Sequence, residues 1–222
     1  MHETPEAPLS DAPVPQADMG WLQTMIEGSR QHNSIAAQRS GHAVVVEPLL
    51  PPDPEVLLQA AIILTGDTTQ EGVLVRGVAV AWEEIIRWLA QDPEFLFKIG
   101  WRKLEELIAG AYEREGWSEV ILTPRSGDGG RDIIATKPGI GSIRFYDQVK
   151  AYKPGHIVAA NEVRAMYGVL NLHQNVSKAV VTTTSQFAPG VFDEFKAVMP
   201  HRLELKGRAQ LLEWLQQIRS QK

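Results

Sequence analysis

The segment IRFYDQVK at residues 143–150 carries the pattern that decides the fold class of this chain. It predicts a β-strand, in which successive side chains point to opposite faces of a sheet. Gln148 and Lys150 are therefore expected on one face and Asp147 on the other. If the preceding strand pairs antiparallel with this one, Asp132 near its start comes to lie beside Gln148 and Lys150.

The segments around this strand predict an alternation of helices and strands. Helices are expected at 101–115, 161–170, 190–198 and from 208 onward, and further strands at 118–123, 131–136, 179–183 and 202–205. A Gly-rich turn at 125–130 joins two of the strands. This order predicts an α/β fold, a mixed β-sheet flanked by helices.

The N-terminal part has a different character. Residues 1–20 are rich in proline and predict a flexible tail, and residues 21–92 predict a smaller, mostly helical region. Its helices are expected at Pro54–Leu64 and at 78–90, and Asp92-Pro93 marks the expected boundary with a domain at 93–222. The N-terminal region is interpreted as a recognition, regulatory or oligomerisation segment.

The composition excludes several classes of protein. The chain has no cysteine, which excludes disulfide scaffolds and zinc-thiolate sites, and its N-terminus has no pattern of a signal peptide. No apolar stretch approaches the roughly 20 residues that a membrane helix needs. The six histidines show no metal-ligand spacing. We therefore expect a cytoplasmic protein without a membrane segment.

The net charge of −5 is unevenly distributed. Residues 1–95 contain 4 Lys+Arg and 14 Asp+Glu, a balance of −10, whereas residues 96–222 contain 18 and 13, a balance of +5. Since DNA is bound mainly through its phosphates, the basic part is the better candidate for DNA contact. A solvated mixed surface explains the same balance about equally well.

Asp132, Gln148 and Lys150 suit phosphodiester hydrolysis. A carboxylate and an amide oxygen are ligands for Mg²⁺, and a lysine can orient water or neutralise charge on the phosphate. Glu105 joins them only if its helix turns that side chain inward; otherwise it is an ordinary exposed helix carboxylate. The spacing alone also fits a surface hairpin, so it leaves both readings open.

Seven segments together resemble the catalytic domain of Mrr-like restriction endonucleases, in the PD-(D/E)xK nuclease superfamily. They are LEELIA at 104–109, EREGW at 113–117, TPRSGDGGRDIIA at 123–135, QVKAY at 148–152, VRAMYG at 163–168, VVTTTSQF at 180–187 and RLEL at 202–205. They occur in the family's order across about residues 93–222.

The resemblance implies a restriction-endonuclease-like fold, a mixed β-sheet flanked by helices. It also implies a divalent-metal site formed by Glu105, Asp132 and Gln148, with Lys150 as the catalytic lysine. Mg²⁺ is the expected ion, with Mn²⁺ as a possible substitute. Two positions depart from the family pattern: Gln148 stands where many members have Glu, and Ala151 stands where the family has Arg. The first lowers the negative charge of the site, and the second removes a candidate phosphate contact.

Further residues are expected to contact DNA. These candidates are Ser126, Arg131, Lys153, Arg164 and Thr183. Each also has a plainer explanation as a surface or turn residue.

The sequence thus predicts a Mg²⁺-dependent DNA endonuclease acting in restriction of foreign or modified DNA, an antiviral defence. Cutting both strands needs two active sites, so a dimer or a transient pair is expected. The alternatives are a nuclease-like module that binds DNA without cutting it, and a protein-interaction subunit of a defence or repair complex.

Overall fold

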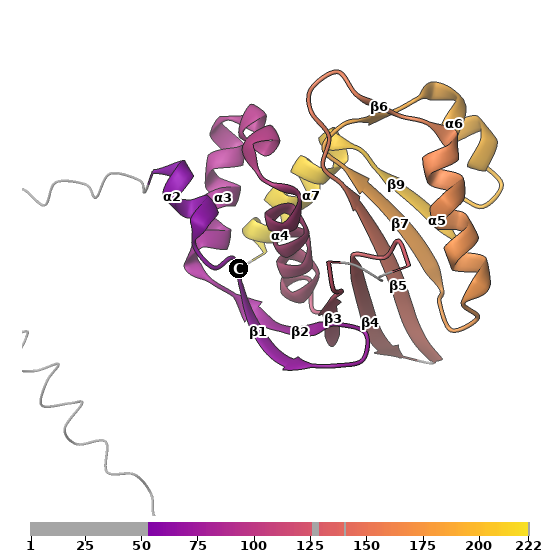
Figure 1. The fold of residues 1–222 in the computed structure, drawn as a ribbon, viewed down its shortest axis with the longest axis horizontal. Coiled ribbons are helices and arrows are strands. Elements are labelled where there is room, and N and C mark those ends of the chain that lie inside the picture. Colours follow the sequence, from indigo (N-terminus) through magenta and orange to yellow (C-terminus); the bar gives the residue numbers. More distant parts are fainter. Residues whose placement is uncertain (1–52, 126–128, 140, 222) are drawn as a thin grey trace, which may run out of the picture. The chain divides into compact units, whose positions relative to one another are not determined.

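A computed structural model describes residues 53–125, 129–139 and 141–221. The expected tail at 1–20, the segment 21–52 and Ser126 lie outside the described residues. Residues Pro52–Lys222 form one compact unit. Its centre is a seven-stranded sheet with the strand order β1-β2-β3-β4-β5-β7-β9 (Figure 1).

The elements have the following bounds. The helices are α2 (Pro54–Gln59), α3 (Val80–Gln91), the 3₁₀ helix η1 (Pro93–Lys98), α4 (Trp101–Arg114), α5 (Ala160–Leu172), α6 (Pro189–Phe195) and α7 (Arg208–Ser220). The strands of the main sheet are β1 (Ile63–Thr68), β2 (Val73–Val78), β3 (Glu119–Leu122), β4 (Ile133–Gly139), β5 (Gly141–Lys150), β7 (Lys178–Thr183) and β9 (Leu203–Lys206). A second, two-stranded sheet contains β6 (Ile157–Val158) and β8 (Gln186–Phe187).

The sheet is mixed because its connections are of two kinds. Neighbouring strands from β1 to β5 are antiparallel, whereas β5, β7 and β9 are parallel. Antiparallel neighbours can be joined by short turns, but parallel neighbours need a crossover, and α5 and α6 provide it. β5 lies at the junction of the two halves, so its C-terminal end has an antiparallel neighbour on one side and a parallel neighbour on the other.

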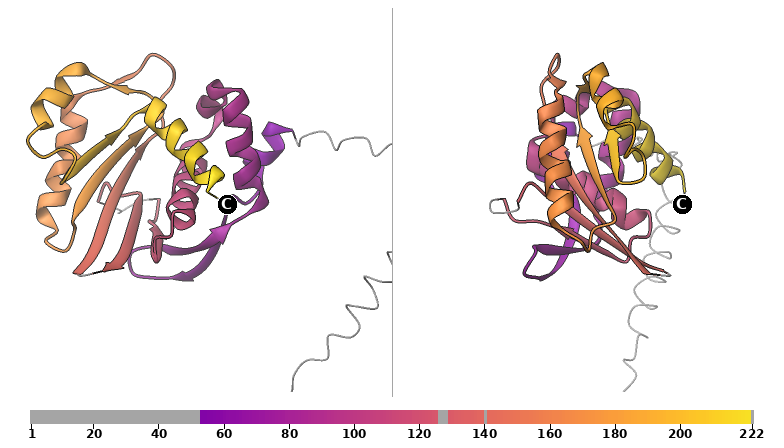
Figure 2. Two further views of the ribbon diagram at one scale, coloured as in Figure 1. Left: turned by 180° about the vertical axis from the view of Figure 1, so that it is seen from behind. Right: turned by 90° about the vertical axis from the view of Figure 1, so that its right-hand side faces the viewer.

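Helices cover both faces of the sheet (Figure 2). On one face, side chains of α3, α4 and α7 pack with Ile133 and Ala135 of β4. On the other face, side chains of α5 and α6 pack with Ile134 and Tyr146. The alternation of neighbouring β4 residues between the two cores is the two-residue period of a buried strand.

The structure confirms the predicted α/β class, and the helices and strands expected from residue 101 onward are present. The helix expected at Pro54–Leu64 is wrong in its second half, because α2 ends at Gln59 and β1 begins at Ile63. β1 and β2 form a hairpin that pairs with β3. Residues on both sides of the boundary expected at Asp92-Pro93 therefore share one sheet and one core.

Two local features connect this N-terminal segment to the rest of the unit, one at the start of η1 and one between β2 and β3. Asp92 is an N-cap: its side chain accepts a hydrogen bond of 3.0 Å from the Glu94 N–H and starts η1 within the same unit. Gly72 has φ of +147°, and a Cβ there would lie 2.3 Å from the Leu122 carbonyl oxygen. Only glycine allows β2 to approach β3 this closely.

The described part of the chain contains no helix both long and apolar enough to cross a membrane.

Candidate active site

The antiparallel pairing of β4 and β5 places Asp132 beside the end of β5, as the sequence predicts. The Asp132 N–H donates to the Asp147 carbonyl oxygen at 3.0 Å. Its carboxylate turns back to β5 and accepts a hydrogen bond of 2.7 Å from the Val149 N–H. Asp132 is therefore fixed next to the backbone between Gln148 and Lys150.

Gln148 brings an amide to the same corner. Among the described residues nothing donates a hydrogen bond to its Oε1 atom, although that atom is buried. A buried acceptor without a donor is costly, so this oxygen is placed to meet a cation or a water molecule. Gly130 makes room for the amide: it has φ of +79°, and a Cβ there would lie 3.3 Å from Gln148 Nε2.

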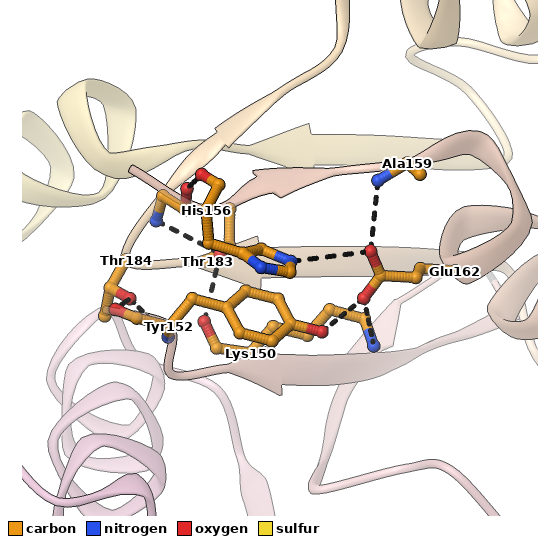
Figure 3. A network of polar contacts seen from close by, with 8 residues as sticks. Lys150, Tyr152, His156, Ala159, Glu162, Thr183 and Thr184 are labelled. Carbon is orange, nitrogen blue, oxygen red and sulfur yellow. Dashed lines mark hydrogen bonds and ion pairs between the residues drawn. The ribbon is translucent and has the colours of Figure 1, made fainter. Parts of the chain in front are cut away.

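Lys150 ends β5 and is held by a carboxylate from α5 (Figure 3). Its Nζ lies 3.6 Å from Oε2 of Glu162, and both side chains are largely buried. The Tyr152 hydroxyl donates to the same oxygen. The other oxygen, Oε1, accepts from the Ala159 N–H at 3.0 Å and lies 3.8 Å from Nε2 of His156.

These contacts stabilise the charged form of Glu162. Burial alone would raise the pKa of its carboxyl group. The hydrogen bonds from Tyr152 and the Ala159 N–H and the positive charge of Lys150 outweigh burial, so that the pKa of Glu162 lies below its usual value. Glu162 is thus a fixed anion that orients the ammonium of Lys150.

Hydrogen bonds of Thr183 and Thr184 connect the C-terminal ends of β7 and β5. The Thr183 hydroxyl donates to the Lys150 carbonyl oxygen at 3.0 Å. The Thr184 hydroxyl donates to the Tyr152 carbonyl oxygen at 2.8 Å and accepts from the Tyr152 N–H at 2.7 Å. Both threonines are buried, so the hydroxyl of Thr183, an expected DNA contact, has a structural partner instead.

Glu105 points inward from α4, which is the condition that its predicted role requires. It is 3% exposed and forms an ion pair of 2.8 Å with Arg102. Arg102 also donates to the Thr123 carbonyl oxygen at 3.0 Å. The Thr123 N–H in turn donates to the Asp132 carbonyl oxygen at 3.0 Å. This chain of contacts ties Glu105 to the corner that holds Asp132.

The expected DNA contacts are dispersed. Lys153 is exposed, in the segment that follows the end of β5 at Lys150. Arg131 packs its guanidinium 5.0 Å from the Tyr146 ring centroid, with NH1 3.3 Å from the hydroxyl. Arg164 lies on the outer side of α5, in a two-point ion pair of 2.6 and 2.7 Å with Glu194 of α6. Arg131 and Lys153 thus lie close in sequence to Asp132 and Lys150, whereas Arg164 is engaged with Glu194.

Asp147 lies on the opposite face from Gln148, as the alternation predicts. It is 1% exposed and accepts hydrogen bonds of 2.9 Å from the hydroxyls of Tyr112 and Thr182. Burial raises its pKa to about 6, although the nearby charge of Lys206 and these two hydrogen bonds act to lower it. Asp147 therefore cannot replace the carboxylate that position 148 lacks.

The residues present fit a site with few carboxylates. Among the described residues no three His, Cys, Asp or Glu side chains gather around one point. Mg²⁺ needs only one or two carboxylates, because it keeps several of its waters. Asp132 and the buried oxygen of Gln148 meet this requirement. An ion with high carboxylate demand, such as Ca²⁺, fits less well.

Sequence reasoning missed Glu162 and the role of Tyr152. Glu162 is the third residue of α5 and accepts from the Ala159 N–H, but Ala159 has no side-chain oxygen, so the sequence lacks the Ser/Thr-x-x-Glu signature of such a helix N-terminus. Nothing in the sequence indicates that this carboxylate also reaches Lys150, because that contact depends on how α5 crosses the sheet.

A mixed sheet flanked by helices, with an amide and a lysine at the end of β5 and an acidic residue beside them just before β4, defines the class of restriction-endonuclease-like domains. A model of the restriction endonuclease family with the Mrr-type catalytic domain matches residues 96–215. This is more than half of the chain. The chain therefore belongs to this family, and the resemblance found in the sequence is confirmed.

Individual relatives are distant. The uncharacterized protein y4cE of Sinorhizobium fredii (strain NBRC 101917 / NGR234) is 24% identical over 133 residues, 60% of this chain and 34% of y4cE. Among solved structures, the MspJI restriction endonuclease in complex with a 27-mer oligonucleotide is 16% identical with a TM-score of 0.39, over 66% of this chain and 34% of that one. The DNA modification-dependent restriction endonuclease AspBHI is 23% identical with a TM-score of 0.39, over 63% and 34%. The chain thus spans about a third of the length of each of these proteins.

Proposed function

We propose that this chain is a metal-dependent endonuclease that hydrolyses phosphodiester bonds of DNA. The observation that carries the proposal is the corner at the end of β5. The carboxylate of Asp132 directly precedes β4. The buried oxygen of Gln148, which has no donor among the described residues, and the anchored ammonium of Lys150 belong to the neighbouring strand β5. Membership of the restriction endonuclease family supports the same reaction.

In this proposal Asp132 and Gln148 hold a Mg²⁺ ion through oxygen atoms, with Mn²⁺ as a substitute, and Glu105 contributes negative charge from α4. A divalent ion bound there supplies positive charge to the scissile phosphate and activates water for attack. Asp132 is suited to this role because its backbone and one carboxylate oxygen are fixed by β5. Gln148 is suited because its buried oxygen is not satisfied by any described residue.

Lys150 neutralises the charge that develops on the phosphate. Its position is set by Glu162, and the backbone that carries it is fixed by Thr183 and Thr184. Such prearranged charge lowers the barrier because no reorganisation is needed during the reaction. Lys153, exposed beyond the end of β5, and Arg131, which precedes Asp132, are the proposed phosphate contacts.

The test is nicking of supercoiled plasmid by the full chain with Mg²⁺ or with EDTA. We expect cleavage only with Mg²⁺ or Mn²⁺, and a loss of at least about 100-fold in Asp132→Ala and Lys150→Ala, since positioned electrostatic groups contribute on this scale. Lys137→Ala is the matched control, because Lys137 is an exposed lysine in β4, away from this corner. Equal cleavage by wild type and Lys150→Ala would refute the proposal.

A DNA-binding module without catalysis is the second candidate, and the departures at Gln148 and Ala151 favour it. It predicts retained DNA binding in the absence of any metal-dependent nicking. An interaction subunit of a defence or repair complex predicts neither, even at low salt where phosphate contacts are strongest.

We place this activity in the restriction of foreign or modified DNA in the cytoplasm. The support is the family, together with the absence of cysteine from the sequence. Cutting both strands needs two sites, so we propose that two copies of the chain act together on duplex DNA. Plasmids with and without methylation test whether modified DNA is the preferred substrate.

A further inference from the structure

An exposed tryptophan lies next to the proposed active site. Trp101 is the first residue of α4 and is 52% exposed, although its ring is large and apolar. It lies one helical turn before Glu105, so the two side chains share a face of the helix. The guanidinium of Arg125, which follows the end of β3, lies 5.9 Å from its ring centroid.

Trp101 forms one wall of a groove at the end of β5. Its cavity of about 210 Å³ is lined by Phe97 and Trp101 on one side and by Ala151, Tyr152 and Lys153 on the other. Ala151 to Lys153 directly follow Lys150, so the groove begins where the proposed active site ends.

A second cavity continues the groove. It measures about 270 Å³, shares Phe97 and Thr184 with the first, and adds His156 and Arg208. The His156 ring stacks on Tyr152 with centroids 3.7 Å apart. The Arg208 guanidinium lies 4.6 Å from the Phe97 ring centroid.

The groove therefore combines aromatic faces with cations along its length. Arg125, Lys153 and Arg208 provide positive charge that complements a phosphate backbone, although Arg208 is also paired with Glu94. Duplex DNA hides the faces of its bases, whereas a single strand exposes them. Aromatic side chains interleaved with cations are the pattern that binds single-stranded nucleic acid, because every base has a face that can stack.

We propose that this groove binds a single DNA strand beside the scissile phosphate, with an unpaired base stacked on Trp101. The inference rests on the proposed nuclease function and specifies its substrate: DNA with unpaired bases next to the cleavage site, such as a gap, a flap or an opened duplex. Arg125 and Lys153 hold the phosphates on either side of that base.

The first experiment measures binding, so that it does not depend on cleavage. Fluorescent oligonucleotides are titrated into the full chain carrying Lys150→Ala, as a duplex and as the same duplex with a gap. Adding Trp101→Leu should weaken binding of the gapped DNA by about 5- to 100-fold, the range for loss of one base–aromatic stack. The duplex should lose less than twofold. Trp101→Phe keeps an aromatic face and should recover most of the affinity.

Leu172→Ala is the surface control, since Leu172 is 82% exposed at the end of α5. It should change neither affinity. Equal effects of Trp101→Leu on gapped and duplex DNA, or no effect on either, would overturn the stacking proposal.

A cleavage assay separates this inference from the proposed function. This assay uses the wild-type chain, with lysine at position 150. The groove proposal fails, while the nuclease proposal stands, if this chain nicks duplex plasmid with Mg²⁺ but cuts gapped DNA no faster, and if Trp101→Leu changes neither rate. If no DNA is cut, the nuclease proposal fails, and a gap-specific loss of binding in Trp101→Leu still supports the groove.

Discussion

Glu162 is the residue whose removal tests how Lys150 acts. A carboxamide at this position keeps the size of the side chain but loses the charge that faces the ammonium. We expect Glu162→Gln to lower kcat about tenfold, equivalent to about 1.4 kcal/mol, with little change in KM, because DNA binding does not use this carboxylate. Steady-state cleavage at several DNA concentrations measures both constants.

The control for this variant is Glu194→Gln. Glu194 also pairs with a cation, Arg164, but on the outer side of α5 and α6. It should leave both constants unchanged. A purely structural role of Glu162 would instead show as a lower melting temperature with an unchanged rate for the folded protein.

Gly130 tests the amide at position 148. Alanine there is strained by the φ of +79°, and its Cβ would lie 3.3 Å from Gln148 Nε2. We expect Gly130→Ala to displace the amide and to weaken Mg²⁺ or Mn²⁺ binding about tenfold, measured by titration calorimetry without DNA. Gly155→Ala is the control, because its φ is +85° but no atom lies near the new Cβ. Equal metal affinities in the two variants would contradict the expected displacement of the Gln148 amide.

At the scale of single elements, the sequence predicted β5 and its neighbours well, because a buried strand imposes a two-residue period on its own sequence. It thereby predicted that Asp147 and Gln148 point to opposite faces. It did not predict the β1–β2 hairpin. Five of the six β1 residues are exposed, so no alternation marks it, and the hairpin is defined by its pairing with β3, which is distant in sequence.

The contact between α5 and β5 was unpredictable for a related reason. Glu162 reaches Lys150 only because a crossover helix returns over the face of the sheet that carries Gln148. Helical periodicity identifies which side of α5 is buried, but not which strand residue lies beneath it.

The buried carboxyl group of Asp147 in β5 is expected to make the stability of the fold depend on pH. Burial raises the pKa of Asp147 from 3.8 to about 6, so the folded state binds this proton more tightly than the unfolded state does. Protonation of Asp147 therefore contributes to the free energy of unfolding. This contribution is fully present below about pH 4 and is lost as the pH rises through about 6. A shift of about two units corresponds to up to about 3 kcal/mol.

Asp147→Asn removes the titration and keeps an oxygen that can accept from Tyr112 and Thr182. We expect the variant to match wild type near pH 4 and to exceed it at pH 7 by up to about 3 kcal/mol in free energy of unfolding. Urea denaturation at both pH values measures this difference. A constant difference across that range would contradict the assignment.

At the scale of the whole molecule, part of the charge asymmetry of the chain is neutralised by ion pairs within the fold. Of the balance of −10 in residues 1–95, residues 53–95 contribute 2 Lys+Arg and 8 Asp+Glu, or −6. Three of these carboxylates form ion pairs with cations beyond residue 95: Glu71 with Arg144, Glu83 with Arg114, and Glu94 with Arg208. The acidic segment therefore neutralises part of the basic segment within one unit, which weakens its interpretation as a separate acidic partner surface.

The shared core on both sides of Pro93 determines which truncated chains are expected to fold. A chain starting at Pro93 loses α3, whose side chains Trp82, Ile85, Ile86 and Leu89 are at most 2% exposed and belong to the core that α4 completes. It also loses the hydrogen bond of 2.9 Å from Trp82 Nε1 to the Leu107 carbonyl oxygen. At about 1.5–3 kcal/mol for each large buried side chain, this loss is comparable to the net stability of about 5–15 kcal/mol that a folded domain has. We expect the chain from Pro93 to show no cooperative thermal transition and to aggregate on size exclusion.

The control is a chain from Asp53, which keeps every contact described above and should melt within a few degrees of the full chain. A cooperative transition in the shorter chain, at the same temperature, would show that β3 and α4 fold without the hairpin and that the boundary lies at Pro93 after all.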